Sequence, residues 1–371
     1  MNGNLRVGNL FGIPFYVNVS WFLVLMLVTW QYGSGLAAAF PQLGAGSPWV
    51  LGLGAALMLF ASVLAHELGH SFAAMKQGIG VNSITLFLLG GLAALEKESE
   101  TPKGAFQVAI AGPLVSFALF ALFSVVGLVL PAGPIGGIVA LLAYINLALG
   151  AFNLIPGLPL DGGNVLKSIV WQITGQPHKG MVFASRVGQV IGWSAIALGV
   201  GSILGLSPVG SVWTLLIGLF LLQNANRTAQ FGTVQGRLAG LTAVDAIAAD
   251  SPVVAANTSL REFADNALLA APSAWRKFLV ADETGSLVGT VLVDALKQVP
   301  REQWANTSVA AIMESTASIG TVVADRPLME VIQTLETQKI QALAVVRNDG
   351  SLAGLLEKTS IQALLRSPQA A

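Results

Sequence analysis

A His-Glu-x-x-His motif at residues 66–70 (HELGH) lies in an apolar segment long enough to cross a bilayer. The run from Trp49 to Ala65, directly before it, carries no charged residue. On a helix, side chains four residues apart project from one face, so two imidazoles can share a zinc ion with the glutamate as general base. A carboxylate at membrane depth is costly and indicates function. The pattern predicts zinc-dependent hydrolysis within a membrane.

The composition agrees with a membrane protein. Of the 371 residues, 54% are hydrophobic and 10% charged, against about 25% charged in soluble domains. A net charge of zero gives no sign of a nucleic-acid partner. The absence of cysteine excludes disulfides and thiolate ligands, and His66, His70 and His178 are the only histidines. A third protein ligand to zinc must therefore be a carboxylate or His178.

The charges divide the chain into two parts. Residues 1–230 hold 5 of the 19 acidic and 8 of the 19 basic residues, and the remainder holds 14 and 11. We predict a membrane domain over 1–230, a linker from Asn224 to Arg237, and a soluble C-terminal domain of ordinary size. The expected fold class is a polytopic α-helical membrane protein, with a short membrane-associated β region, followed by a soluble α/β pair.

The number and orientation of the spans follow from length and charge. A membrane helix needs about 20 apolar residues. The basic residues of the first part fall at the N-terminus, in the second and fourth loops or after the last span, which places both termini in the cytoplasm. We expect the first span to be an uncleaved anchor. The six predicted spans are 18–40, 48–76, 103–130, 135–156, 184–205 and 208–225.

Two acidic residues of the first part stand apart from the polar cluster at 96–100, which we interpret as a solvated loop. One is Glu67 of the motif. The other is Asp161, which follows a turn in which Pro156 and Pro159 break the fourth helix. We predict that Asp161 is the third metal ligand; its alternative role is a helix N-cap. His178 is expected at the surface.

Two asparagines lie on roughly one face of the fourth span, because Asn146 and Asn153 are seven residues apart. Asn153, beside the Asp161 turn, is a candidate for contact with the substrate or an oxyanion. The alternative is that both amides join neighbouring helices.

At this point the chain resembles the site-2 protease family of intramembrane zinc metalloproteases, in its six-span branch with cytoplasmic regulatory domains and no PDZ insertion. The resemblance implies a zinc ion held by His66, His70 and Asp161, with Glu67 activating its water for attack on a peptide carbonyl and Asn153 near the substrate. It also implies a multi-pass protein of a bacterial or archaeal cell membrane that cleaves single-span membrane proteins within the lipid bilayer. The matching segments are HELGH (66–70), ITLFLLGG (84–91), AGPLVS (111–116) and FNLIPGLPLDGGNVL (152–166). One departure is Ser116, where the family often has asparagine, and we assign that segment no direct role.

Residues 81–95 are rich in β-forming side chains and interrupted by Gly90 and Gly91. We predict a hairpin that enters the membrane from the cytoplasmic side and pairs its edge with an extended substrate. The alternative is a surface hairpin that closes the site. Proline at Thr85 or Phe87 would test strand pairing.

The C-terminal part repeats with an offset of 65, so that residues 242–300 align with 307–365. Each half is predicted to contain a short helix, a strand, a helix, two strands around a glycine turn and a final helix. This rhythm resembles a tandem pair of CBS domains, assigned to 237–300 and 305–371, and implies a regulatory module that can form a homodimer. The positions that usually contact ribose in an adenine nucleotide are Leu292, Ala295, Glu357 and Ser360, and Asp294 is out of register. A nucleotide site and a dimerisation module without ligand both stay open.

Two other functions fit parts of the pattern. A CBS-regulated metal-ion transporter could use the His and Asp residues to bind its cation, and an inactive relative could act as a binding chaperone. Glu67, placed between two metal ligands where hydrolysis needs a base, favours the protease over both.

Overall fold

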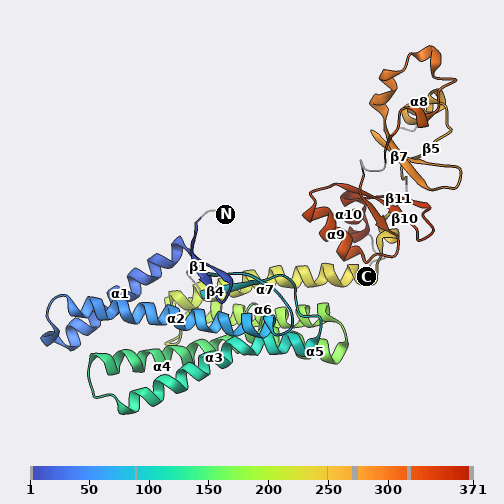
Figure 1. Cartoon of the computed structure of the whole chain (residues 1–371). Helices are drawn as coiled ribbons and strands as arrows, with labels where there is room; N and C mark the ends of the chain where they lie inside the picture. Colours follow the sequence, from blue (N-terminus) through green and yellow to red (C-terminus); the bar gives the residue numbers. More distant parts are fainter. Residues whose placement is uncertain (1–2, 88–89, 249, 270–274, 316–318, 367–371) are drawn as a thin grey trace. The chain divides into compact units, whose positions relative to one another are not determined.

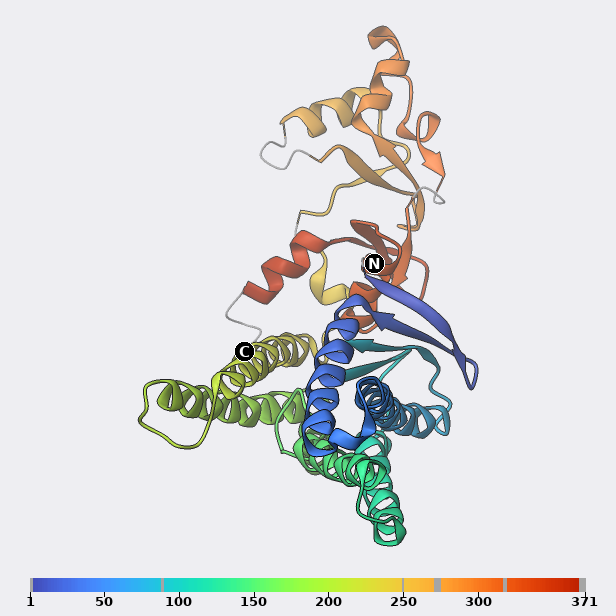
Figure 2. The same ribbon diagram turned by 90° about the vertical axis from the view of Figure 1, so that its left-hand side faces the viewer.

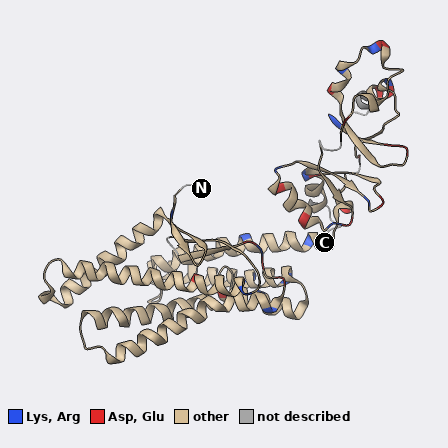
Figure 3. Ribbon diagram, viewed as in Figure 1, with Lys and Arg blue, Asp and Glu red and all other residues tan. Residues whose placement is uncertain are grey.

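The chain forms two compact units, Met1–Thr233 and Val234–Ala371. The computed structural model describes residues 3–87, 90–248, 250–269, 275–315 and 319–366. Charged side chains are sparse on the helices of the first unit and frequent on the second, as Figure 3 shows.

Helices dominate the first unit (Figure 1). Five of them are long and apolar enough to cross a membrane, within the described residues. These five are α1 (Val19–Ala39), α2 (Ser47–Met75), α3 (Pro102–Val129), α4 (Pro134–Asn153) and α6 (Pro177–Ile203). They coincide with the first five predicted spans, and their ends follow local signals: Asn18 and Thr101 cap α1 and α3, and a proline opens α3, α4 and α6.

The sixth predicted span forms the first part of α7 (Val212–Leu238). Its apolar run ends at Leu222 and is followed by Gln223 and Asn224. The segment predicted as a linker, 224–237, continues the same helix. It contains no proline, and its two alanines and two glutamines favour helix.

A short amphipathic helix, α5 (Asp161–Thr174), separates α4 from α6. The turn at residues 154–160 precedes it and contains a cis Leu158–Pro159 bond. The Leu158 N–H donates to the Ala184 carbonyl of α6, at 3.2 Å, which ties the turn to the bundle.

The first unit also contains a four-stranded sheet in the order β1-β2-β3-β4, which lies alongside α2 in both views (Figures 1 and 2). The predicted hairpin is present as β3 (Val81–Phe87) and β4 (Gly90–Leu95), and residues 88–89 between them lie outside the described residues. The hairpin β1 (Asn4–Leu10) and β2 (Ile13–Asn18) was not expected; β2 pairs in parallel with β3. Among the described strands, β4 pairs only with β3 and is an edge strand.

The second unit is an α/β pair of similar halves, as the repeat predicts. One sheet has the order β5-β6-β7-β8 and the other β11-β10-β9. A buried cluster of Leu279, Ala344 and Leu355 packs between them. The elements are β5 (Val253–Ala255), α8 (Leu260–Leu269), β6 (Lys277–Ala281), β7 (Leu287–Leu292), β8 (Glu314–Ser315), β9 (Thr321–Val323), α9 (Leu328–Thr337), β10 (Ala342–Val346), β11 (Leu352–Glu357) and α10 (Lys358–Arg366), with short 3-10 turns at Ala243–Ala246, Val293–Gln298, Arg301–Gln303 and Val309–Ala311.

The two halves exchange their opening segments. Ala243 and Ala246 are buried in the core that surrounds Leu328 and Val345 of the second half. Val309 is buried in the core of the first half, with Leu260, Phe263 and Val280. The halves are therefore interleaved and share their cores.

Candidate metal centre

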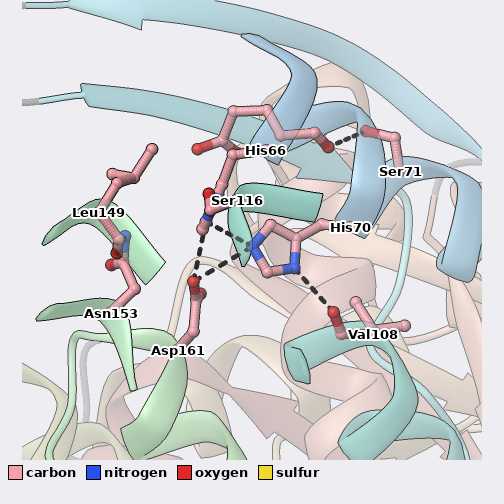
Figure 4. Close-up of polar contacts among 9 residues, drawn as sticks. His66, His70, Ser71, Val108, Ser116, Leu149, Asn153 and Asp161 are labelled. Carbon is pink, nitrogen blue, oxygen red and sulfur yellow. Dashed lines mark hydrogen bonds and ion pairs between the residues drawn. The ribbon is translucent and has the colours of Figure 1, made fainter. Parts of the chain in front are cut away.

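The two histidines of the motif project from one face of α2, one turn apart, toward α3 and α5 (Figure 4). The His66 side chain is 4% exposed and that of His70 is 12% exposed. Their Nε2 atoms lie 3.2 Å apart. The helix continues to Met75 beyond the motif, so the spacing of the two rings is fixed by regular helical geometry.

Asp161 is the first helical residue of α5, and Leu160 occupies the N-cap position. Its Oδ2 atom lies 3.0 Å from His66 Nε2 and 3.3 Å from His70 Nε2. A side chain at Gly162 or Gly163 would overlap the backbone of the preceding turn, so glycine at both positions allows the turn to fold onto α5. The structure thus brings together the three residues predicted as metal ligands, although Asp161 follows His66 by 95 residues in the sequence.

Helix α3 provides a hydrogen-bond partner for Nδ1 of each ring. The Ser116 hydroxyl lies 2.9 Å from His66 Nδ1, and the Val108 carbonyl oxygen lies 2.7 Å from His70 Nδ1. A Cβ atom at Gly112 would overlap His70 Nε2 and lie 2.6 Å from His66 Nε2. The absence of a side chain there lets α3 approach the rings. Sequence reasoning gave the AGPLVS segment no direct role, and Ser116 and Val108 are site residues that it missed.

These donors fit a zinc ion. Two imidazole nitrogens and one carboxylate oxygen are a common catalytic donor set, with the fourth position open to water or substrate. Ligand atoms about 2.0–2.1 Å from a tetrahedral ion lie roughly 3.3 Å from one another, and the three separations here are 3.0, 3.2 and 3.3 Å. Both rings also have a partner on the nitrogen that would face away from the ion, as zinc-binding histidines usually do. Among the described residues, His66, His70 and Asp161 form the one such cluster, and the half-exposed His178 stands outside it.

The three donors open onto a cavity of about 380 Å³. Glu67 and Asn153 line the same cavity. The Asn153 amide nitrogen donates to the Leu149 carbonyl at 3.1 Å. Asn146 lies elsewhere: it is fully buried and donates to Ser62 Oγ of α2 at 3.0 Å, so the predicted helix-joining role applies to Asn146. Residues of β4 also line the cavity: Gly90, Gly91, Leu92, Ala93 and Leu95.

Apolar helices that carry a two-histidine, one-carboxylate site beside a glutamate define a membrane-embedded zinc hydrolase. The model of peptidase family M50 matches residues 54–135 and 127–195. A protein of Synechocystis sp. (strain PCC 6803), named as a zinc metalloprotease, is 54% identical over 372 residues, covering 100% of this chain and 97% of its own. The chain belongs to peptidase family M50, the site-2 proteases, and is an integral membrane zinc metalloprotease.

Two solved structures are similar to separate parts of the chain. The site-2 protease from Methanocaldococcus jannaschii is 29% identical over 61% of this chain and 95% of its own, with a TM-score of 0.45. The CBS domain of a bacterial CNNM/CorC family Mg²⁺ transporter, solved with ATP, is 14% identical over 36% of this chain and 92% of its own, with a TM-score of 0.29. The relative at 54% identity confirms the predicted family. The structure itself has the predicted fold class, apolar helices with a short sheet followed by an α/β pair of similar halves.

Proposed function

We propose that the chain is an intramembrane endopeptidase that cleaves transmembrane segments of other membrane proteins. The observation that carries this is the position of Glu67. It stands on α2 between His66 and His70 and lines the same cavity as all three metal ligands. A carboxylate in this position is suited to proton transfer, and the helix that carries it is one of the five apolar enough to span a bilayer.

Each residue of the centre has a distinct task in this proposal. A zinc ion, when bound, would lower the pKa of a water and polarise a carbonyl. Glu67 accepts a proton from the attacking water and passes it to the amine of the leaving peptide. His66, His70 and Asp161 hold the metal, and Asn153, on the wall of the cavity, contacts the substrate or the oxyanion through its amide.

The substrate would be presented as a strand added to β4. A helical segment has its carbonyls hydrogen-bonded, so it must unwind before attack. The free edge of β4 faces the cavity, and the Ala93 backbone hydrogen-bonds to the Glu67 carboxylate. The Glu96 N–H, by contrast, donates back to Gly80 at 2.9 Å. Because N–H groups alternate along a strand, those of Ala93 and Leu95 point to the free edge.

Strand addition should be tested on β4, because β4 is at the edge of the sheet and β3 is not. Thr85 and Phe87, suggested from sequence, lie on β3, which pairs with both β2 and β4, so proline there would disrupt the sheet itself. Leu95→Pro removes an outward N–H and leaves the ladder to β3 intact. We expect slower cleavage with unchanged zinc content. The matched control is Leu95→Ala, which changes the same side chain but keeps the outward N–H. Unimpaired cleavage by Leu95→Pro would rule out pairing at this position.

The protease assignment is tested by co-expression with a tagged single-span substrate. We expect cleavage by the wild type and none by Glu67→Gln, with zinc content kept in Glu67→Gln and lost in Asp161→Ala. Equal cleavage by the wild type and Glu67→Gln would overturn the proposal. Metal uptake into vesicles that is unaffected by Glu67→Gln would instead support a cation transporter.

We further propose that both termini are cytoplasmic, that the protein resides in the cell membrane, and that the CBS pair regulates cleavage. The loops after α1, α3 and α6 carry no Lys or Arg, which supports this orientation.

Ser360 is one of the positions that usually contact ribose. Its hydroxyl already has partners within the second half, where it donates to the Ala246 carbonyl and accepts from the Glu357 N–H. Titration calorimetry with ATP and AMP separates a nucleotide-regulated pair from a dimerisation module, and light scattering reports the homodimer.

A further inference from the structure

A buried lysine lies in the wall of the catalytic cavity. Lys167 is on α5, two turns beyond Asp161, and its side chain is 9% exposed. Its Nζ atom donates to Glu98 Oε2 at 2.6 Å. Lys167, Glu98 and Asn164 line the cavity together with the metal ligands and Glu67. Among the described residues of the lining, Lys167 is the only lysine or arginine.

The two partners in this ion pair differ greatly in exposure. The Glu98 side chain is 72% exposed. A carboxylate in water loses little on leaving a pair, whereas a buried ammonium left without a partner is strongly unfavourable. Lys167 therefore requires an anion, but nothing about its environment requires that anion to be Glu98. An acidic group that enters the cavity would satisfy the same ammonium.

The loop that carries Glu98 has an independent attachment. The Ser99 hydroxyl donates to Gln77 Oε1 at 3.1 Å, and Gln77 also donates to the Gly104 carbonyl at 3.1 Å. The loop is thus fastened to the ends of α2 and α3 without Lys167. Glu98 can turn toward solvent while its backbone stays in place.

We infer that Lys167 is a substrate subsite for an acidic side chain, and that Glu98 occupies this subsite until the substrate arrives. The inference rests on the proposed function, since it concerns what the protease selects. The remaining charged groups of the cavity, Glu67 and Asp161, repel an incoming carboxylate unless zinc is bound. Lys167 is therefore the side chain that can attract an Asp or Glu of the unwound substrate.

The experiment compares single-span substrates that carry Glu or Gln at successive positions near the cleavage site, cleaved by purified full-length enzyme. At one position we expect a preference for Glu of about tenfold in kcat/KM, the size of one charge-assisted hydrogen bond. Lys167→Gln should lose this preference and still cleave the Gln substrates. Glu98→Gln should keep or increase it, because the competing carboxylate is gone. Lys167→Glu should prefer Lys at the same position.

A purely structural pair gives a different result. Lys167→Gln and Glu98→Gln would then impair all substrates alike, and the wild type would show no dependence on substrate charge; either outcome overturns the inference. The matched control is Lys97→Gln, which breaks an exposed ion pair with Glu100 in the same loop. Zinc content monitors folding, and Lys167→Arg provides a second variant with the charge retained. Loss of all cleavage in Glu67→Gln tests the protease assignment separately, whatever the substrate preference.

Discussion

The Ser116 hydroxyl lies 2.9 Å from Nδ1 of His66, and both residues are buried. Ser116 can accept a hydrogen bond from the Nδ1–H of His66, which leaves the lone pair of Nε2 directed at Asp161 and His70. The same logic applies to His70, whose Nδ1 faces the Val108 carbonyl, an atom that can only accept. The Val108 carbonyl therefore sets the tautomer of His70, and the Ser116 hydroxyl allows the same tautomer for His66.

Ser116→Ala should weaken zinc binding. Loss of such a partner typically costs 10- to 100-fold in metal affinity, and competition with a chelator in detergent measures it. The control is Ser71→Ala, which removes an equally buried hydroxyl that donates to the Glu67 carbonyl on α2. Similar affinities in the two variants would contradict a role for Ser116 in holding His66.

Gly112→Ala should abolish the centre. The added Cβ would overlap the ring of His70 and lie 2.6 Å from Nε2 of the buried His66, while Nδ1 of each ring is held by a partner on α3. We expect the purified variant to contain less than one tenth of the wild-type zinc, a shift of about 1.4 kcal/mol or more. Gly127→Ala on the same helix meets only Val139, at 3.8 Å, and should retain zinc. Full occupancy in Gly112→Ala would show that α3 does not approach the rings as described.

The cluster of His66, His70 and Asp161 was predictable because the chemistry of these residues is local. Two of the three histidines in the chain stand at helical spacing, and an acidic residue follows a proline-rich turn. Few other residues of the first part could donate to a metal. Ser116 and Val108 could not be found this way. A serine in an apolar helix has no distinctive pattern, and a backbone carbonyl has none at all. Gly112 beside Pro113 is the one sequence signal for the close packing of α3.

The same distinction applies to the fold. The first five spans and the strands of the C-terminal repeat follow from patterns within one segment, so they were predicted to within a few residues, apart from the earlier start of α6 at Pro177. The pairing of β2 with β3 joins residues that are distant in the sequence, such as Phe15 and Ile84. The exchanged segments around Ala243 and Val309 each pack on the opposite half of the repeat. Such contacts are decided by tertiary packing, which composition along the chain does not encode.

Acid should weaken the turn between β6 and β7. The Thr284 hydroxyl and the Ser286 N–H donate to Asp282 Oδ1 and hold the pKa of that carboxyl below its ordinary value of 3.8. A depressed folded pKa gives stability that is present above the unfolded pKa of about 3.9 and lost as pH falls through the folded value. Asp282→Asn should therefore reduce the loss of thermal stability between pH 5 and pH 3. Asp265→Asn, on the exposed face of α8, is the control; equal effects would exclude the turn.

Asn146 and Ser62 form a buried hydrogen bond between α4 and α2, one turn before His66. Both Asn146→Ala and Ser62→Ala should destabilise the bundle, and a double-mutant cycle isolates the bond itself. Couplings of this kind inside membranes are about 0.6 kcal/mol on average and reach about 1.7 kcal/mol. Denaturant unfolding in detergent measures each variant. Ser194→Ala, which removes a hydroxyl bonded within α6, should be additive with Asn146→Ala. A coupling as small for Ser62 as for Ser194 would mean that the bond does not hold α2 against α4, and that the register of the metal-binding helix is set by packing alone.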